Sequence, residues 1–165
     1  MQLKQLSILI VLSGFFLTAC KNNTKTAIMN TTNNNAIFPK GGKLNNGYFT
    51  GDAFLEPLLA KDANNDFAMG SVTFEPGART NWHTHPKGQV LIVTEGQGWY
   101  QEKGKPAQVI KKGDVINIPE NIEHWHGASS KRMMSHIAIT NYKGEENVVW
   151  LKPVTGEEYI AVNKN

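Results

Sequence analysis

The stretch from Gly77 to Gly96 reads G-A-R-T-N-W-H-T-H-P-K-G-Q-V-L-I-V-T-E-G. His83 and His85 alternate along it, so in an extended strand both imidazoles point to the same face. Gln89 follows a Pro-Lys-Gly corner and begins an apolar run that predicts the next strand. The stretch therefore predicts two imidazoles and one amide group presented by neighbouring strands.

A second stretch, Gly113–His126, reads G-D-V-I-N-I-P-E-N-I-E-H-W-H. It supplies His124 at the end of a strand, far along the chain from the first stretch. This third imidazole meets the other donors at one point only if the sheet closes on itself. Imidazole and amide donors gathered in this way are typical of a transition-metal site. The two stretches together predict a metal site inside a small barrel.

The remaining segments alternate apolar and polar residues over short runs, and none carries apolar residues at helical spacing over a long distance. Many short strands at regular spacing predict an all-β fold, an antiparallel barrel or jelly roll. We expect turns at 95–98 and 103–105 and a short helix at 156–161. The predicted strands are 48–59, 68–75, 81–85, 89–94, 98–101, 107–110, 114–118, 134–140 and 148–151. The predicted core includes Phe74, Ile92, Ile116, Ile118, Ile137 and Ile139.

The first residues of the chain predict export rather than part of the fold. Residues 1–20 combine Lys4, an apolar run too short to span a bilayer and the sequence L-T-A-C ending at Cys20. Small residues before a cysteine resemble a bacterial lipobox, which implies cleavage before Cys20 and a lipid anchor on its sulfur as the only membrane attachment. Cys20 is the single cysteine, so no internal disulfide can form. The predicted product is an exported lipoprotein, periplasmic or at the cell surface.

Residues 21–37 are rich in Asn and Thr and too poor in apolar residues to offset their ordering entropy, so they predict a disordered tether. Residues 38–165 have the size of one domain. The net charge of +3 is modest and the lysines are dispersed, which argues against a nucleic-acid partner and leaves a small molecule. The segment Tyr48–Leu59 is a natural exchange arm between copies, so we expect a homodimer or larger homo-oligomer.

Both stretches resemble the sequence motifs of the cupin family. The first matches cupin motif 1 at its glycines and histidines, with Gln89 where many cupins carry Glu. The second matches motif 2 at Gly113, Pro119 and His124, and departs from it with Asn121 for Gly and Ala128 for Asn. The resemblance implies a single cupin domain, a double-stranded β-helix of jelly-roll type.

A narrower resemblance is to the small bacterial cupins with (R)-selective hydroxynitrile lyase activity. It rests on the runs S-V-T-F-E-P-G-A-R-T, W-H-T-H-P-x-G-Q and H-W-H-G-A, and on a further histidine twelve residues after His124. In those enzymes three His and one Gln hold manganese. The resemblance therefore implies that the metal ligands are His83, His85, Gln89 and His124.

The donor types alone admit several divalent metals: Mn, Fe, Ni, Zn or Cu. Affinity order favours Cu or Zn, so the expectation of Mn or Fe comes from the resemblance. Gln in place of Glu removes one negative charge from the ligand set, which leaves the ion a stronger Lewis acid.

His126 and His136 are the candidate catalytic residues. Both would face the metal side of their strands if the alternation continues, and an imidazole titrates near working pH. Each is a general base or proton shuttle, or else a hydrogen-bonded histidine of the core. The resemblance implies a carbon–carbon lyase in which the metal polarises the substrate oxygen and a histidine takes the proton. Other metal-cupin chemistry, a dioxygenase or a sugar-uronate isomerase, stays open, as does a non-catalytic cupin that binds a small ligand.

Overall fold

The computed structural model describes residues 36–163. The predicted signal peptide with Cys20, and nearly all of the predicted tether, lie outside the described residues. The described residues belong to one compact unit. Within residues 36–163, no helix is both long enough and apolar enough to cross a membrane. The elements are β1 (Gly42–Lys43), β2 (Phe49–Thr50), β3 (Ala53–Leu59), β4 (Phe67–Phe74), β5 (Arg79–Thr80), β6 (His83–Thr84), β7 (Gln89–Glu102), β8 (Gln108–Lys111), β9 (Val115–Ile118), β10 (His124–Ala128), β11 (Met134–Asn141), β12 (Val149–Trp150) and α1 (Gly156–Val162).

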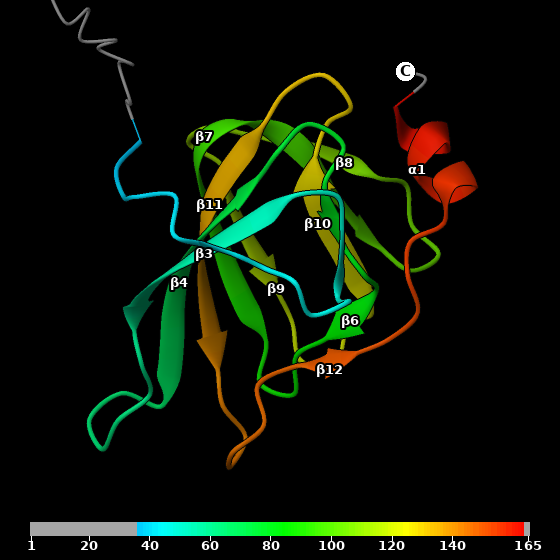
Figure 1. The fold of residues 1–165 in the computed structure, drawn as a ribbon. Coiled ribbons are helices and arrows are strands. Elements are labelled where there is room, and N and C mark those ends of the chain that lie inside the picture. The colour runs from blue at the N-terminus through cyan, green and yellow to red at the C-terminus, as the bar shows by residue number, and fades with distance from the viewer. Residues whose placement is uncertain (1–35, 164–165) are drawn as a thin grey trace, which may run out of the picture. The chain divides into compact units, whose positions relative to one another are not determined.

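The strands pair antiparallel throughout and curl into an open barrel (Figure 1). In one half, β11 lies between β4 and the first part of β7, with β3 beyond β4 and β9 on the other side of β7. In the other half, β10 lies between β5 and the second part of β7, and β8 pairs with β7. The short strand β6 also pairs with β10, and β12 pairs with the other edge of β6. The predicted all-β jelly roll of antiparallel strands is confirmed.

Two predictions about the strands are wrong. Residues 48–59 form two strands, β2 and β3, that pair with different neighbours, and residues 89–101 are not two strands joined by a turn. They belong to the single 14-residue strand β7. Gly96 has a positive φ of 72°, and two residues before it, at Thr94, the pairing of β7 with β11 shifts register opposite Ser135 and His136. A Cβ at Gly96 would lie 1.9 Å from the carbonyl oxygen of Met133, so only glycine fits. The resulting bulge bends β7, which lets one strand serve both halves of the barrel.

The interior holds two hydrophobic clusters, one inside the barrel and one beneath α1. Phe74 and Ile118 belong to the first, and Ile116 packs against it, as predicted. The prediction for three isoleucines is wrong, because His136 and Ala138 of β11 face inward and the strand alternation turns the neighbouring isoleucines outward. These outward, half-buried residues are Ile92, Ile137 and Ile139.

The helix α1 covers the second cluster and confirms the predicted terminal helix. It begins with a capping box in which Thr155 accepts from the backbone of Glu158 and the Glu158 side chain accepts from the backbone of Thr155. Its buried residue Tyr159 packs against Trp125 and donates its hydroxyl to the carbonyl oxygen of Ala128 at 2.9 Å. The helix is thereby fixed to the outer side of β10, whose other side faces the barrel interior.

Candidate metal centre

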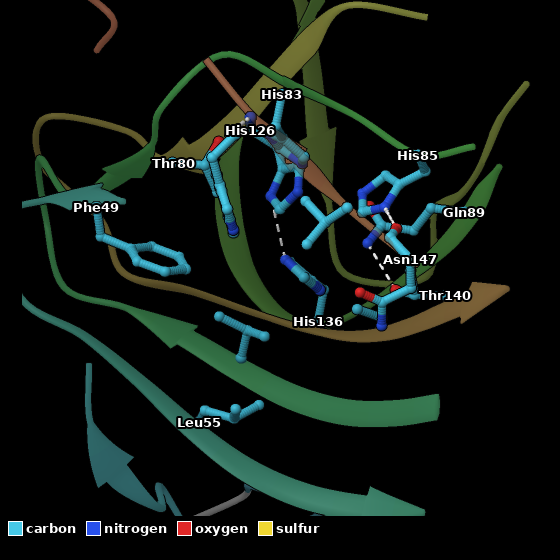
Figure 2. A pocket seen from close by; sticks show the side chains of 14 residues that line it. Phe49, Leu55, Thr80, His83, His85, Gln89, His126, His136, Thr140 and Asn147 are labelled. Atoms are coloured by element: carbon cyan, nitrogen blue, oxygen red, sulfur yellow. Dashed lines mark hydrogen bonds between the residues drawn. The ribbon is translucent and has the colours of Figure 1, made fainter. Parts of the chain in front are cut away.

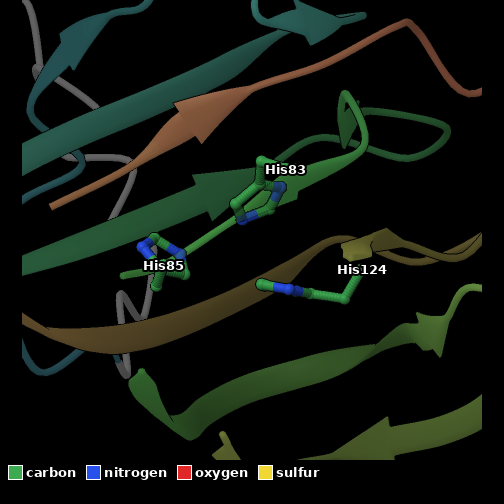
Figure 3. A group of neighbouring side chains, drawn as sticks. All are labelled: His83, His85 and His124. Atoms are coloured by element: carbon green, nitrogen blue, oxygen red, sulfur yellow. The ribbon is translucent and has the colours of Figure 1, made fainter. Parts of the chain in front are cut away.

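Three histidines from two segments converge inside the barrel (Figure 3). The antiparallel pairing of β6 with β10 places His83 directly opposite His124. His85 follows two residues later, and one ligand atom from each of the three lies within 4.8 Å of the others. All three side chains are buried. The alternation expected from the sequence and the closure of the barrel together produce this cluster.

The corner between Pro119 and His124 fixes the third histidine against the first two. Asn121 has a positive φ of 59°, and its backbone N–H donates to the carbonyl oxygen of His85 at 2.9 Å. Asn adopts this left-handed conformation more readily than most residues. The departure from the usual glycine at this position therefore keeps the turn that motif 2 requires.

Each of the three imidazoles is oriented by a backbone carbonyl. Nδ1 of His83 lies 2.9 Å from the oxygen of Asn81, and Nδ1 of His124 lies 2.8 Å from that of Ile122. Nδ1 of His85 lies 2.5 Å from the oxygen of Asn147, in the segment before β12. A carbonyl accepts only, so each Nδ1 is the protonated nitrogen and each Nε2 keeps its lone pair.

Gln89 adds an oxygen donor from the first residue of β7. Its Nε2 donates to Oγ1 of Thr140 at 2.9 Å, while its Oε1 is buried without a hydrogen-bond partner among the described residues (Figure 2). Nε2 of His85 and Nε2 of His124 are likewise buried and unpartnered. Buried polar atoms are normally paired, so this group of free acceptors indicates a site built for a cation.

The electrostatics of the site favour the neutral, ligating form of each imidazole. Burial lowers the pKa of His124 to about 4 and the pKa of His85 below its ordinary value. Burial also lowers the pKa of His83 well below that value, and the nearby His124 and His85 lower it further. At neutral pH all three are uncharged, as metal binding requires. Three imidazole nitrogens and one amide oxygen fit a divalent transition metal.

A cavity of about 230 Å³ opens beside three of these residues, His83, His85 and Gln89 (Figure 2). Its walls come from both halves of the barrel and from the segment around β12. A second hollow of about 520 Å³ shares five of the lining residues, so the two lie next to each other. Apart from the histidines, Gln89 and three polar residues, the lining of the inner cavity is apolar: Phe49, Leu55, Val72, Ala138, Val148 and Trp150.

The two candidate catalytic histidines form a buried pair in this cavity. Nε2 of His136 lies 3.3 Å from Nδ1 of His126, which leaves Nε2 of His126 and Nδ1 of His136 without partners. Burial lowers the pKa of His136 to about 4. Burial also lowers the pKa of His126 well below its ordinary value, and the nearby His136 lowers it further. The ring of His126 lies 5.4 Å from that of His83, so the pair adjoins the presumed metal ligands.

The structure adds site residues that the sequence did not indicate. Trp150 stacks on Tyr48 at 4.8 Å, and its ring lies 4.8 Å from that of His83, so it forms a wall of the cavity. Asn147 acts through its backbone oxygen, which its side-chain type does not reveal. The other three tryptophans, Trp82, Trp99 and Trp125, lie in the cluster beneath α1.

Comparison with known proteins places this architecture in a family. The family model that describes the cupin domain matches residues 70–140 of this sequence, from β4 to β11. The (R)-mandelonitrile lyase of Granulicella tundricola is 46% identical over 112 residues, which are 68% of this chain and 86% of that protein. The chain is a cupin. The predicted resemblance to the hydroxynitrile lyases of this family is confirmed.

Solved structures agree with this assignment. A cupin-like protein from Thermotoga maritima superposes on this cupin with a TM-score of 0.73 and 46% identity, covering 78% of this chain and 97% of that one. A cupin 2 conserved barrel domain protein from Rhodopseudomonas palustris gives a TM-score of 0.57 at 16% identity, covering 75% and 83%. The second likeness supports the fold alone.

Proposed function

We propose that this cupin is a metal-dependent carbon–carbon lyase that cleaves hydroxynitriles. The observation that carries the proposal is a cluster of three neutral histidines which, with Gln89 and a neutral histidine pair, adjoins one largely apolar cavity. The identity of 46% to an (R)-mandelonitrile lyase supports the same reaction class. The substrate would be a small hydroxynitrile whose organic group contacts the apolar wall.

The metal would be held by His83, His85, Gln89 and His124, and the resemblance favours manganese among the metals that these donors admit. When bound, the ion would supply a Lewis acid for the substrate oxygen. The four donors carry no formal charge, so they would leave the positive charge of the ion unneutralised by the protein. The apolar residues of the cavity would exclude water from the substrate and orient its organic group.

The histidine pair would move the proton. In the hydrogen bond between His136 and His126 one nitrogen donates, so the pair always retains one free lone pair, on Nδ1 of His136 or on Nε2 of His126. Because burial lowers both pKa values, this lone pair is unprotonated at neutral pH. The histidine would take the hydroxyl proton as the C–C bond breaks. The electron pair would leave with cyanide, which receives the proton and departs as HCN, and the carbonyl compound remains.

The experiment is cleavage of mandelonitrile by the protein loaded with Mn²⁺, followed by release of benzaldehyde. We expect release by the natural protein and none by His83→Ala. His136→Gln should keep its metal and lose about 100-fold in turnover. Metal-loaded, folded protein that releases no benzaldehyde would refute the lyase assignment. Full turnover in both His136→Gln and His126→Gln would remove the pair from the mechanism.

Export, lipidation and assembly are further parts of the proposal. Residues 1–20 support an exported lipoprotein anchored at Cys20. Incorporation of labelled palmitate that is lost in Cys20→Ala would support the anchor, and incorporation that persists would refute it. Within one copy, β3 already pairs with β4 of the same chain. Light scattering should nevertheless show a homodimer or larger assembly, and a monomer at micromolar concentration would refute that prediction.

A further inference from the structure

The amide of Gln89 has two ends of nearly equal shape and opposite chemistry. Oε1 accepts hydrogen bonds and can bind a cation, whereas the Nε2 amino group only donates. In the metal-free site, the lone pairs of the buried imidazole nitrogens would attract the amino group. A flipped amide would satisfy those lone pairs and turn the oxygen away from them. The oxygen can face the histidines at low cost only if the amino group finds an acceptor elsewhere.

Thr140 is placed to supply that acceptor. Gln89 and Thr140 are paired residues of the neighbouring strands β7 and β11. Oγ1 of Thr140 lies 2.9 Å from Nε2 of Gln89, and both side chains are buried (Figure 2). This hydrogen bond uses the donor end of the amide. Oε1 remains without a hydrogen-bond partner among the described residues and is therefore available to the metal site.

We propose that Thr140 is a positioning residue for metal binding. Its hydroxyl accepts from Nε2 of Gln89 and leaves Oε1 available to the ion, so the amino group stays paired when the metal binds. Without the hydroxyl, either the amino group is buried unpaired or it turns toward the imidazole nitrogens. The inference rests on the proposed metal centre and adds a residue to which the sequence motifs give no role.

The experiment compares two substitutions of nearly equal size in the metal-free protein. Thr140→Val removes only the hydroxyl, and Thr140→Ser retains it. Titration with Mn²⁺ against a competing chelator gives the dissociation constant of each. We expect Thr140→Val to weaken binding by about 10- to 100-fold, as for other groups that orient a ligand, and Thr140→Ser to bind like the natural protein. Circular dichroism of the metal-free variants checks the fold.

A double-mutant cycle separates positioning from a general packing effect. In a Gln89→Ala background there is no amide to orient, so Thr140→Val should cause no further loss of affinity. Natural affinity in Thr140→Val, or an equal loss in both backgrounds, would overturn the role of Thr140 and leave the metal centre intact. If the natural protein binds no Mn²⁺, the metal centre and the role of Thr140 fail together.

Discussion

Acid should destabilise the metal-free protein well above the pH at which carboxylates titrate. Burial lowers the pKa of His124 and of His136 to about 4 from an ordinary value of 6.5. Between these values the unfolded chain binds protons that the folded protein does not, so stability falls as pH falls below 6.5. As the pH falls through this full window, each of these two histidines lowers the free energy of unfolding by about 3 kcal/mol. At pH 4.5 most of this stabilisation is already lost, which amounts to about 5 kcal/mol for His124 and His136 together.

The assay is urea unfolding of chelator-treated protein at pH 7.5, 6.0 and 4.5. A small domain has only about 5–15 kcal/mol in total, so the metal-free protein should be close to unfolding at pH 4.5. His136→Gln removes one of these groups and should reduce the pH-dependent loss by about 2.5 kcal/mol. A free energy of unfolding that is the same at pH 7.5 and 4.5 would show that these histidines are not buried in neutral form.

Three further predictions concern the metal, the barrel and the helix. Mn²⁺ at 100 times its dissociation constant should raise the free energy of unfolding by about 2.7 kcal/mol, and an equal rise in His83→Ala would contradict the assigned ligands. Gly98→Ala should cost about 3 kcal/mol or more in urea unfolding, because its Cβ would lie 2.0 Å from the oxygen of Gly127. Tyr159→Phe should cost about 1 kcal/mol by loss of its bond to Ala128, and unchanged stability would assign no role to that bond.

Local alternation was enough to predict that the donors of the site lie close together, whereas the assignment of the metal ligands came from the resemblance. His83 and His85 share a face because side chains repeat every two residues along a strand, and the glycines and proline around them are turn signals visible in the sequence. The meeting with His124 needs only that the sheet closes. For the same reason, the inward direction of His136 could be predicted from its own strand.

The remaining features depend on tertiary structure. The Glu95–Gly98 segment has the composition of a turn, but β7 continues through it, because β11 pairs with β7 up to Gly96 and β10 pairs with β7 from Gly98 onward. Asn147 contributes a backbone oxygen, and Trp150 lies on a strand of two residues that is too short to show a period. The outward isoleucines of β11 look like core in the sequence, because an apolar residue by itself does not reveal which face of the sheet it occupies.

The most direct test of the central claim is anomalous diffraction from crystals of the protein loaded with Mn²⁺. We predict one strong peak per chain. It should lie within bonding distance of Oε1 of Gln89 and of Nε2 of three histidines: His83, His85 and His124. No ordered metal among these residues, or a peak bound elsewhere on the chain, would contradict the claim that they form a metal centre.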